Sequence, residues 1–196
     1  MFRKEHSLKL KSVTDEALMA LFSSNRRNEA LTELYRRYGS RVFGYFFRMF
    51  QGDRDKAQDF VQELFLRILE RHHQFDPTKK FSTWMFTIAS NMSKTSFRNE
   101  PIKLPVEGHE KVYLSDDDQT KNAFQVAMLQ AISGLDEVHR SAFILRYMNQ
   151  LSLKEISEIN DIPLGTVKSR LFHATRKMTA ALKEFQPNES NMFKLQ

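Results

Sequence analysis

The sequence predicts an all-α protein with two small helical domains joined by a flexible acidic linker, the C-terminal domain being a helix-turn-helix. Three observations support this fold class. The 196 residues include only 6 Gly and 5 Pro, which argues against a turn-rich β fold. Apolar residues recur at helical spacing along most of the chain. The stretch from 99 to 122 lacks that periodicity, contains Pro101 and Pro105, and includes the run Asp116-Asp117-Asp118.

Composition excludes several classes of protein. Without cysteine, the chain cannot be a disulfide scaffold, a cysteine-dependent enzyme, a zinc finger or a thiol redox sensor. No apolar run approaches the roughly 18 residues of a membrane-spanning helix. The polar N-terminus has no apolar segment typical of secretion. We therefore expect a cytoplasmic protein without direct membrane insertion.

Charge is distributed unevenly along the chain. The net charge of +6 divides into +7 for residues 1–98, −3 for residues 99–122 and +2 for residues 123–196. We expect domains at 1–98 and 123–186, with 99–122 as the linker and 187–196 as a tail. The alternative, a long loop inside one domain, is less favoured because loops above about 12–15 residues are uncommon there.

Two helices are expected at the start of the first domain. Thr14 is an N-cap candidate for a helix ending near Ser24, and Asp15 and Glu16 fall in its first turn. A second helix is expected over residues 28–50. Its apolar stripe is Leu31, Leu34, Tyr35, Tyr38, Val42, Tyr45, Phe46 and Met49, and its other face carries Arg36, Arg37, Arg41 and Arg48.

A third helix is expected over residues 54–71, and it carries a row of acidic and amide side chains. We call this row the acidic stripe: Asp55, Asp59, Gln62 and Glu63. Their helical spacing places them together on an exposed face. An acidic row on a basic domain indicates either a contact with a basic protein surface or a solvated face, and the spacing alone does not separate the two.

Residues 72–80 are predicted to form a loop, because Pro77 disfavours helical conformation at Asp76. His72 and His73 are adjacent, which is poor spacing for metal ligands. The sequence thus predicts no metal site and no cofactor.

A fourth helix is expected over residues 82–99, with Ser82 as its cap. Phe86, Ser90 and Ser93 are expected among its surface residues, beside amides and aromatics. The loop and helix also carry the basic and aromatic candidates Phe75, Lys79, Lys80, Trp84, Asn91, Lys94 and Arg98. Cations neutralise phosphates and aromatic rings stack on unpaired bases, so the pattern indicates single-stranded DNA. The alternative is that the aromatics are core residues.

The second domain is expected to begin with helices at 121–132 and 137–148. Ser152 and Glu155 then have capping-box spacing, which predicts a helix from about Leu153. Asp161-Ile162-Pro163 forms a turn, and a further helix runs from about 164 to 185.

These two helices and their turn describe a helix-turn-helix, whose second helix reads the major groove. Between 164 and 183 that helix contains five cations and no acid. The candidate DNA-contacting residues are Thr166, Lys168, Ser169, Arg170, Phe172, His173 and Arg176. The alternative is a structural hairpin with a solvated basic face.

Four motifs resemble one family. They are Leu34–Gly39, Asp55–Arg67, Phe75–Pro77 with Phe81–Asn91, and Leu151–Ile156 with Ile162–Leu171. In this order, the chain resembles bacterial RNA polymerase sigma factors of the extracytoplasmic-function (ECF) group. The resemblance covers about Thr14 to Leu182. It implies a non-enzymatic promoter-specificity subunit that binds core polymerase, recognises −35 and −10 elements and helps open the strands.

The resemblance also implies roles for particular residues. The acidic stripe would dock on the polymerase clamp helices. Phe75, Lys79, Lys80, Trp84, Asn91, Lys94 and Arg98 would hold the opened −10 strand. Lys168, Ser169, Phe172 and His173 would meet −35 bases, with Thr166, Arg170 and Arg176 nearer phosphates. Two departures stand out, since His173 and Thr175 occupy positions where arginines are common in the family.

The implied partners are core RNA polymerase, through its clamp and flap, and promoter DNA, both double-stranded and opened. An anti-sigma factor, often membrane-bound in this family, would hold the chain inactive. A free-standing helix-turn-helix repressor or activator is the competing hypothesis. The acidic stripe followed by a basic aromatic helix favours the sigma factor, because a repressor needs neither feature. A hydrolase or nuclease would need convergent catalytic groups, and the sequence shows none.

Overall fold

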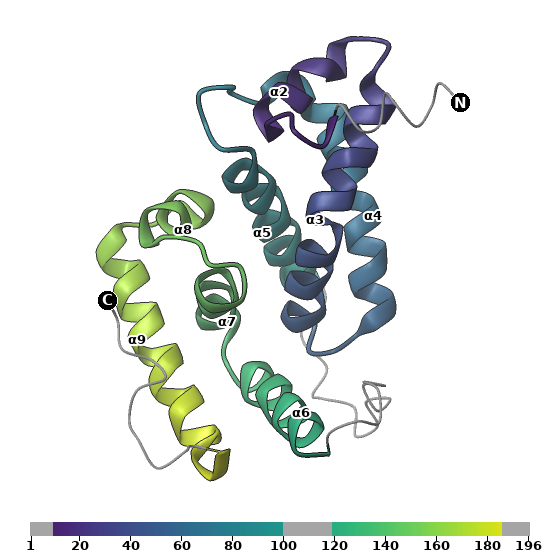
Figure 1. Cartoon of the computed structure of the whole chain (residues 1–196). Coiled ribbons are helices and arrows are strands. Elements are labelled where there is room, and N and C mark those ends of the chain that lie inside the picture. Colours follow the sequence, from purple (N-terminus) through teal and green to yellow (C-terminus); the bar gives the residue numbers. More distant parts are fainter. Residues whose placement is uncertain (1–9, 100–118, 186–196) are drawn as a thin grey trace.

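The computed structural model describes residues 10–99 and 119–185, and in these ranges the protein is helical with no strand. Figure 1 shows two groups of helices lying against each other. The N-terminal half (residues 10–99) contains α2 (Asp15–Ala20), η1 (Leu21–Ser23), α3 (Arg27–Met49), α4 (Arg54–Arg71), η2 (His72–Gln74) and α5 (Phe81–Asn99). The C-terminal half (residues 119–185) contains α6 (Gln119–Ser133), α7 (Glu137–Phe143), the π-helix η3 (Ile144–Met148), α8 (Leu153–Asn160), α9 (Leu164–Ala181) and η4 (Lys183–Phe185). The predicted all-helical fold is confirmed.

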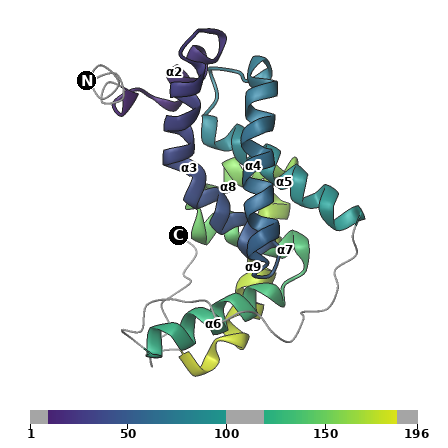
Figure 2. The same ribbon diagram turned by 90° about the vertical axis from the view of Figure 1, so that its right-hand side faces the viewer.

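The core of the N-terminal half forms where α3, α4 and α5 meet. Helices α3 and α4 lie side by side (Figure 2), joined by a tight turn in which Gln51 and Gly52 have φ values of 59° and 94°. Asp53 caps α4 by accepting a 2.9 Å hydrogen bond from the backbone N–H of Lys56. Fully buried side chains from the three helices fill the core, among them Leu34, Val42, Phe46, Val61, Leu64, Ile68, Met85 and Ala89.

Most predicted helix ends are confirmed in this half. The α4 bounds match the prediction, and α3 begins and ends one residue early. Thr14 caps α2, accepting from the Ala17 N–H at 3.2 Å. One apolar prediction is wrong, because Tyr35 is 47% exposed. Its ring lies at the rim of the core and meets the edge of Phe65 at 5.0 Å between centroids.

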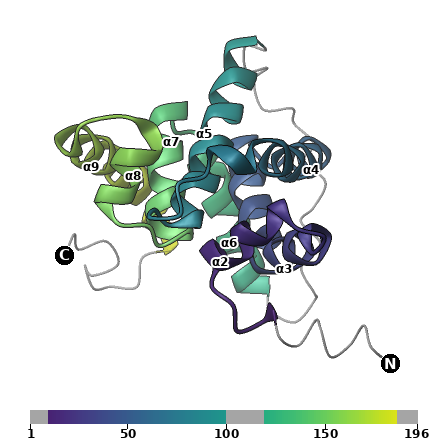
Figure 3. The ribbon, with the colours of Figure 1, turned by 90° about the horizontal axis from the view of Figure 1, so that it is seen from above.

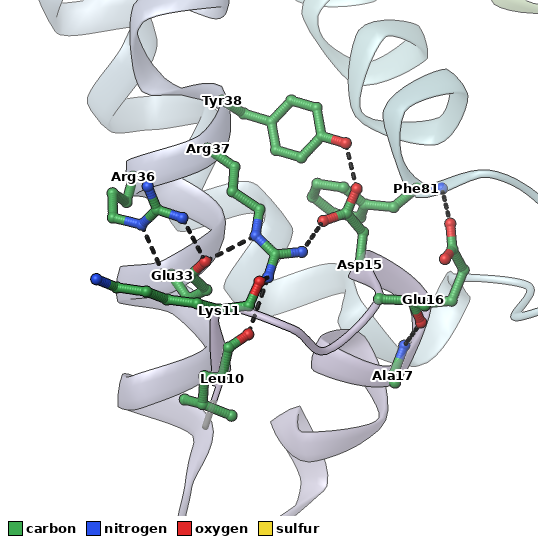
Figure 4. A network of polar contacts seen from close by, with 11 residues as sticks. Leu10, Lys11, Asp15, Glu16, Ala17, Glu33, Arg36, Arg37, Tyr38 and Phe81 are labelled. Atoms are coloured by element: carbon green, nitrogen blue, oxygen red, sulfur yellow. Dashed lines mark hydrogen bonds and ion pairs between the residues drawn. The ribbon is translucent and has the colours of Figure 1, made fainter. Parts of the chain in front are cut away.

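A network of ion pairs fastens α2 to α3 (Figure 4). The buried Glu33 carboxylate accepts from Arg36 at 2.7 and 2.8 Å and from Arg37 at 2.8 Å. Arg37 also donates to Asp15 of α2 at 2.7 Å, and the Tyr38 hydroxyl donates to the same carboxylate. Arg37, predicted on the face away from the apolar stripe, is thus a half-buried structural residue. Because these hydrogen bonds favour the ionised carboxylate, Arg36 above all and Arg37 lower the pKa of Glu33 from 4.5 to about 2, against the opposing effect of burial.

The C-terminal half packs around α7 and α9. The predicted helix at 137–148 forms with the expected ends, as α7 followed by η3. Asp136, just before α7, accepts from Lys177 of α9 at 3.1 Å and lies 3.2 Å from His139. These partners, Lys177 first, lower the pKa of Asp136. The contact ties the start of α7 to the middle of α9.

Arg140 is 2% exposed and acts as a hydrogen-bond donor to the ends of helices. Its guanidinium donates to the carbonyls of Ile132, Ser133 and Leu135 at 3.2, 2.8 and 2.8 Å, where α6 ends. It also donates to the Met49 carbonyl at the end of α3, at 2.7 Å. Carbonyls at helix C-termini lack intrahelical partners and carry partial negative charge, so a cation satisfies them.

The two halves lie in direct contact, which the sequence did not predict. Seen from above, α7 and α8 lie beside α5 (Figure 3). The predicted linker (99–122) falls largely on residues 100–118, and the predicted tail (187–196) falls on residues 186–196, both outside the described residues. Within the described ranges, no helix is long and apolar enough to cross a membrane. The described residues also bring together no cluster of three or more His, Asp or Glu side chains suited to a metal ion.

The Glu33 network predicts a specific dependence of stability on acid. Glu33→Gln should lower the free energy of unfolding at pH 7 by about 2 kcal/mol, since hydrogen bonds to a buried charged group are lost. Because the folded-state pKa lies below the ordinary value, this contribution is complete above about pH 5 and is lost as the pH falls from 4.5 towards 2. Urea unfolding of both proteins across pH 7 to 3 measures it. A difference that stays constant over this range would contradict the assignment.

Candidate polymerase and promoter interfaces

The acidic stripe lies on the exposed face of α4. Ala57, Val61 and Ile68 turn the opposite face into the core, so the helical period leaves all four stripe residues exposed. The Glu63 carboxylate accepts from Arg67 at 2.8 Å, one turn further along. The structure thus brings the four predicted residues together on one surface.

Leu66 extends this surface and was missed by the sequence reasoning. It is 54% exposed and lies beyond Gln62 and Glu63 on the same helix. Its exposure could have been predicted from its position, because Phe65 and Ile68 define the buried face of the helix and Leu66 does not lie on that face. An exposed leucine beside carboxylates gives the surface an apolar component.

The loop before α5 is held in a defined conformation. The Asp76 carboxylate accepts from the backbone N–H of Thr78 at 2.9 Å and from its hydroxyl at 2.7 Å. These two bonds lower the pKa of Asp76, the hydroxyl contributing most. The turn places Lys79 and Lys80 in solvent at the entrance to α5.

Phe75 and Trp84 form a half-buried aromatic pair. Their ring centroids lie 5.3 Å apart, and Phe81 contacts both rings at 6.1 and 6.2 Å. The core interpretation of these aromatics is therefore partly confirmed, and the DNA interpretation stays a prediction. One side of each ring packs on the core and the rest remains accessible.

The cap of α5 differs from the prediction. The helix begins at Phe81, so Ser82 lies inside it. The N-terminal backbone is satisfied by Glu16 of α2, whose carboxylate accepts from the Phe81 N–H at 3.0 Å (Figure 4). A carboxylate is favourable at this positive end of the helix dipole. Glu16 therefore positions the helix that carries most of the −10 candidates.

The remaining −10 candidates divide into two sets along α5. Asn91 and Arg98 are exposed, as is Lys79 in the loop. Lys80 and Lys94 instead contact the C-terminal half, and Lys94 is half-buried. The cause of its lowered pKa is burial first and the nearby Arg170 second.

Three residues expected on the surface of α5 are buried. Phe86, Ser90 and Ser93 lie beneath neighbouring helices. Phe86 packs edge-on against Tyr45 of α3 at 5.7 Å, and Ser90 donates to Asn160 of α8 at 3.1 Å. The expectation was wrong because the face that carries these residues is the one that meets the other helices.

The helix-turn-helix has the predicted local structure. Ser152 and Glu155 form the capping box, with the Ser152 N–H donating to Glu155 at 2.8 Å and the Glu155 N–H donating to Ser152 at 3.2 Å. Asp161 ends α8 in the left-handed conformation, φ 53°. The Ser157 hydroxyl donates to the Ile162 carbonyl at 2.5 Å and closes the turn before α9.

The outer face of α9 carries a continuous row of exposed side chains. We call it the recognition stripe: Lys168, Ser169, Phe172, His173 and Arg176. Thr166 and Arg170 flank it and are half-buried. Phe172 is 56% exposed, which is unusual for a large apolar residue, and its ring contacts His173 at 5.5 Å between centroids. All seven predicted −35 candidates thus lie on or beside one face.

Both halves of the chain match models of known protein families. Residues 34–100 match the model of sigma-70 region 2, and residues 125–178 match that of sigma-70 region 4. The chain is 30% identical to the ECF RNA polymerase sigma-E factor of Haemophilus influenzae, covering 83% of this chain and 92% of that protein.

Two solved structures share the fold. One is CnrH in complex with the cytosolic domain of CnrY, with a TM-score of 0.67, 22% identity and coverage of 88% of this chain and 99% of CnrH. The other is the sigma factor RpoE of Bartonella quintana in complex with the anti-sigma factor NepR, with a TM-score of 0.64, 21% identity and coverage of 79% and 98%. The protein therefore belongs to the ECF group of RNA polymerase sigma factors, non-enzymatic subunits of transcription initiation with sigma-70 regions 2 and 4.

Proposed function

We propose that this chain divides promoter recognition among three of its surfaces. The acidic stripe of α4 binds the polymerase clamp, the loop and helix around α5 hold the opened −10 strand, and the recognition stripe of α9 reads the −35 element. The observation that carries the proposal is the presence, on one chain, of an exposed acidic surface apart from two basic ones. DNA repels the first and attracts the others, so their partners must differ in kind.

The protein partner of the acidic stripe is inferred from charge and shape together. Its carboxylates are exposed, and Leu66 adds an apolar contact at one end. A basic helical surface satisfies both features, since charge complementarity directs encounter and buried apolar side chains slow dissociation. Core polymerase is the partner that the family implies.

The −10 surface is suited to an unpaired strand. Phe75 and Trp84 present accessible ring surface beside Lys79 and Lys80. Asn91, Lys94 and Arg98 continue the surface along α5 with an amide and two cations. Stacking contributes about 1–3 kcal/mol per base, and the lysines neutralise phosphates.

The −35 surface is suited to a major groove. Lys168, Ser169 and His173 can reach base edges, and Phe172 can contact a thymine methyl group. Thr166, Arg170 and Arg176 flank them and lie nearer the phosphates. The remaining exposed surface of the C-terminal half is proposed to meet the polymerase flap.

The proposed division of the chain follows these surfaces. The −10 and clamp functions lie within residues 1–98 and the −35 function within 123–186, with 99–122 as a linker and 187–196 as a tail. We place the protein in the cytoplasm, where an anti-sigma factor holds it until transcription is required. Support for such a partner comes from the fold shared with the RpoE–NepR complex.

Reconstituted transcription tests the proposal. Purified chain and core polymerase should together produce run-off transcripts from promoters selected out of random DNA, and core polymerase alone should not. Failure to bind core polymerase would contradict the proposal.

Reversing charge on the acidic stripe should weaken core binding. We expect Asp59→Lys combined with Glu63→Lys to lower the affinity for core polymerase at least about tenfold, because favourable charge pairs become repulsive. Binding of the same variant to isolated −35 duplex should be unchanged. Glu70→Lys, an exposed acid on the same helix outside the stripe, is the matched control. Equal loss of both kinds of binding would argue against a clamp contact.

Removing the Trp84 ring should impair strand opening selectively. Trp84→Ala should reduce open-complex formation about tenfold, equivalent to one lost stacking contact, while closed-complex affinity stays within about twofold. Permanganate reactivity of unpaired thymines measures opening, and Trp84→Phe should restore much of it. Because Trp84 packs on Phe75 and Phe81, thermal unfolding is measured in parallel. Equal defects in both complexes would make Trp84 a packing residue only.

Lys168 should help to determine −35 preference. Lys168→Ala should reduce the preference for one base at one position of the −35 element. The loss should be about 1–3 kcal/mol in binding free energy, as expected for a lost base contact. Selection of bound duplexes from a random pool gives the preference. Lys183→Ala, which removes an exposed lysine beyond α9, should leave it unchanged. An unaltered preference in the Lys168 variant would place this lysine on phosphate.

A further inference from the structure

Helix α7 lies beside α9 (Figure 1), and two side-chain contacts join them one helical turn apart. Lys177 of α9 lies 3.1 Å from the carboxylate of Asp136, the residue that precedes α7. One turn earlier on α9, the centroid of the His173 ring lies 5.9 Å from that of the His139 ring of α7. Because residues three or four apart share one face of a helix, both contacts lie on the same pair of facing surfaces.

His139 takes part in both contacts. Its Nδ1 atom lies 3.2 Å from Asp136 Oδ2, the oxygen that also pairs with Lys177. The side chain of His139 is 22% exposed, and its Nδ1 atom is buried. The ring therefore lies between Asp136 on its own helix and His173 on α9. A largely buried ring with neighbours on two sides has little freedom to change its orientation.

Three rings in succession connect this contact to the recognition stripe. His139 meets His173 at an interplanar angle of 76°, and His173 meets Phe172 at 78° with centroids 5.5 Å apart. Near-perpendicular contacts of this kind place the edge of one ring against the face of the next, an arrangement that aromatic side chains favour. Phe172 and His173 are exposed, whereas His139 is half-buried. The orientation of the two exposed rings therefore depends on the half-buried one.

The two positions at which this sequence lacks the expected arginines both have partners on the preceding helix. His173 meets His139 of α7, and the Thr175 hydroxyl lies 3.4 Å from the Tyr147 hydroxyl of η3. An arginine is a long cation that can reach a phosphate from many directions. A histidine ring is short, so what it can reach depends on how the ring is turned. The neighbouring helix thus gains control over the contacts that His173 can make.

Ring orientation matters for base recognition in two ways. An exposed side chain on a helix samples several rotamers, and ordering it on binding lowers the affinity. A ring that is already held in the free protein avoids much of this cost. A held ring also presents its polar atoms in one direction, so that it can distinguish one base edge from another.

We propose that His139 is a positioning residue for −35 recognition. Its ring orients His173, and through His173 the ring of Phe172, so that part of the −35 preference is determined from outside the recognition helix. Asp136 and Lys177 hold His139 in place for this role. The inference rests on the proposed function of the recognition stripe, and it requires no contact between His139 and DNA.

Two substitutions at His139 separate the effect of the ring from that of its nitrogens. His139→Gln keeps polar atoms and removes the ring, whereas His139→Phe keeps a ring that can meet His173 and removes the nitrogen beside Asp136. Each variant of the full chain is combined with core polymerase, and promoters randomised over the −35 element are selected by binding and sequenced. Val138→Ala, at an exposed position of α7 next to His139, is the control. Thermal unfolding is measured for every variant.

His139→Gln should weaken binding of the preferred promoter about threefold, the effect of one side chain that must now be ordered on binding. It should also reduce the base preference at the same positions that His173→Ala affects. His139→Phe should retain most of the preference, because the ring contact remains. An unchanged preference in the Gln variant overturns the proposal, and so does loss of the preference in the Phe variant. If the natural chain itself selects no −35 sequence, the proposed role of α9 is overturned instead.

A double substitution distinguishes positioning from packing. In the His173→Ala background, His139→Gln should change neither the promoter affinity nor the base preference any further, because its effect passes through the ring that has been removed. A residue that only stabilised the C-terminal half would weaken binding equally in both backgrounds. Equal losses in the presence and absence of the His173 ring would therefore contradict the proposal.

Discussion

The α5 helix must satisfy three kinds of neighbour at once, and much of the structure depends on that constraint. Its apolar face, with Met85 and Ala89, completes the core of the N-terminal half. A second face, with Ser90 and Lys94, meets α8. A third carries Asn91 and Arg98 into solvent. Because a helix has only about 3.6 residues per turn, each of the three faces consists of about one residue per turn. Few positions on α5 can therefore be substituted without affecting one of these contacts.

The fixed position of α5 depends on polar contacts that reach it from distant parts of the chain. Glu16 satisfies its first backbone N–H, and Glu16 is itself held because α2 is fastened to α3 through Asp15 and Arg37. The short helix α2, which carries no proposed DNA contact, thus sets the orientation of the surface that does. Ion pairs of this kind are costly to break singly because a partner is left buried without its counter-charge.

The features that depend on local interactions could be predicted from the sequence. The α4 bounds follow from the Asp53 cap and the apolar period, and the Ser152–Glu155 capping box follows from spacing three residues apart. The residues whose environment is set by a partner far away in the chain could not be placed in this way. Ser82 was predicted as the α5 cap, whereas the actual acceptor, Glu16, lies 65 residues from Phe81 and could not be identified from spacing. Nothing in the sequence around Arg140 indicates that its side chain is buried and donates to the Met49 carbonyl, 91 residues away. Ser90 and Ser93 were expected in water because periodicity cannot distinguish a polar residue facing solvent from one facing another polar surface.

The burial of polar residues such as Ser90, which the sequence pattern could not predict, also bears on the energetics of the contact between the halves. Each hydrogen bond in this contact, such as that from Ser90 to Asn160, contributes only about 0.5–1.5 kcal/mol, since it replaces one made with water. Losing one of these bonds costs more than the bond contributes, because Ser90 is buried and would be left without a partner. The polar residues that could not be placed from the sequence therefore help to determine how the two halves fit together.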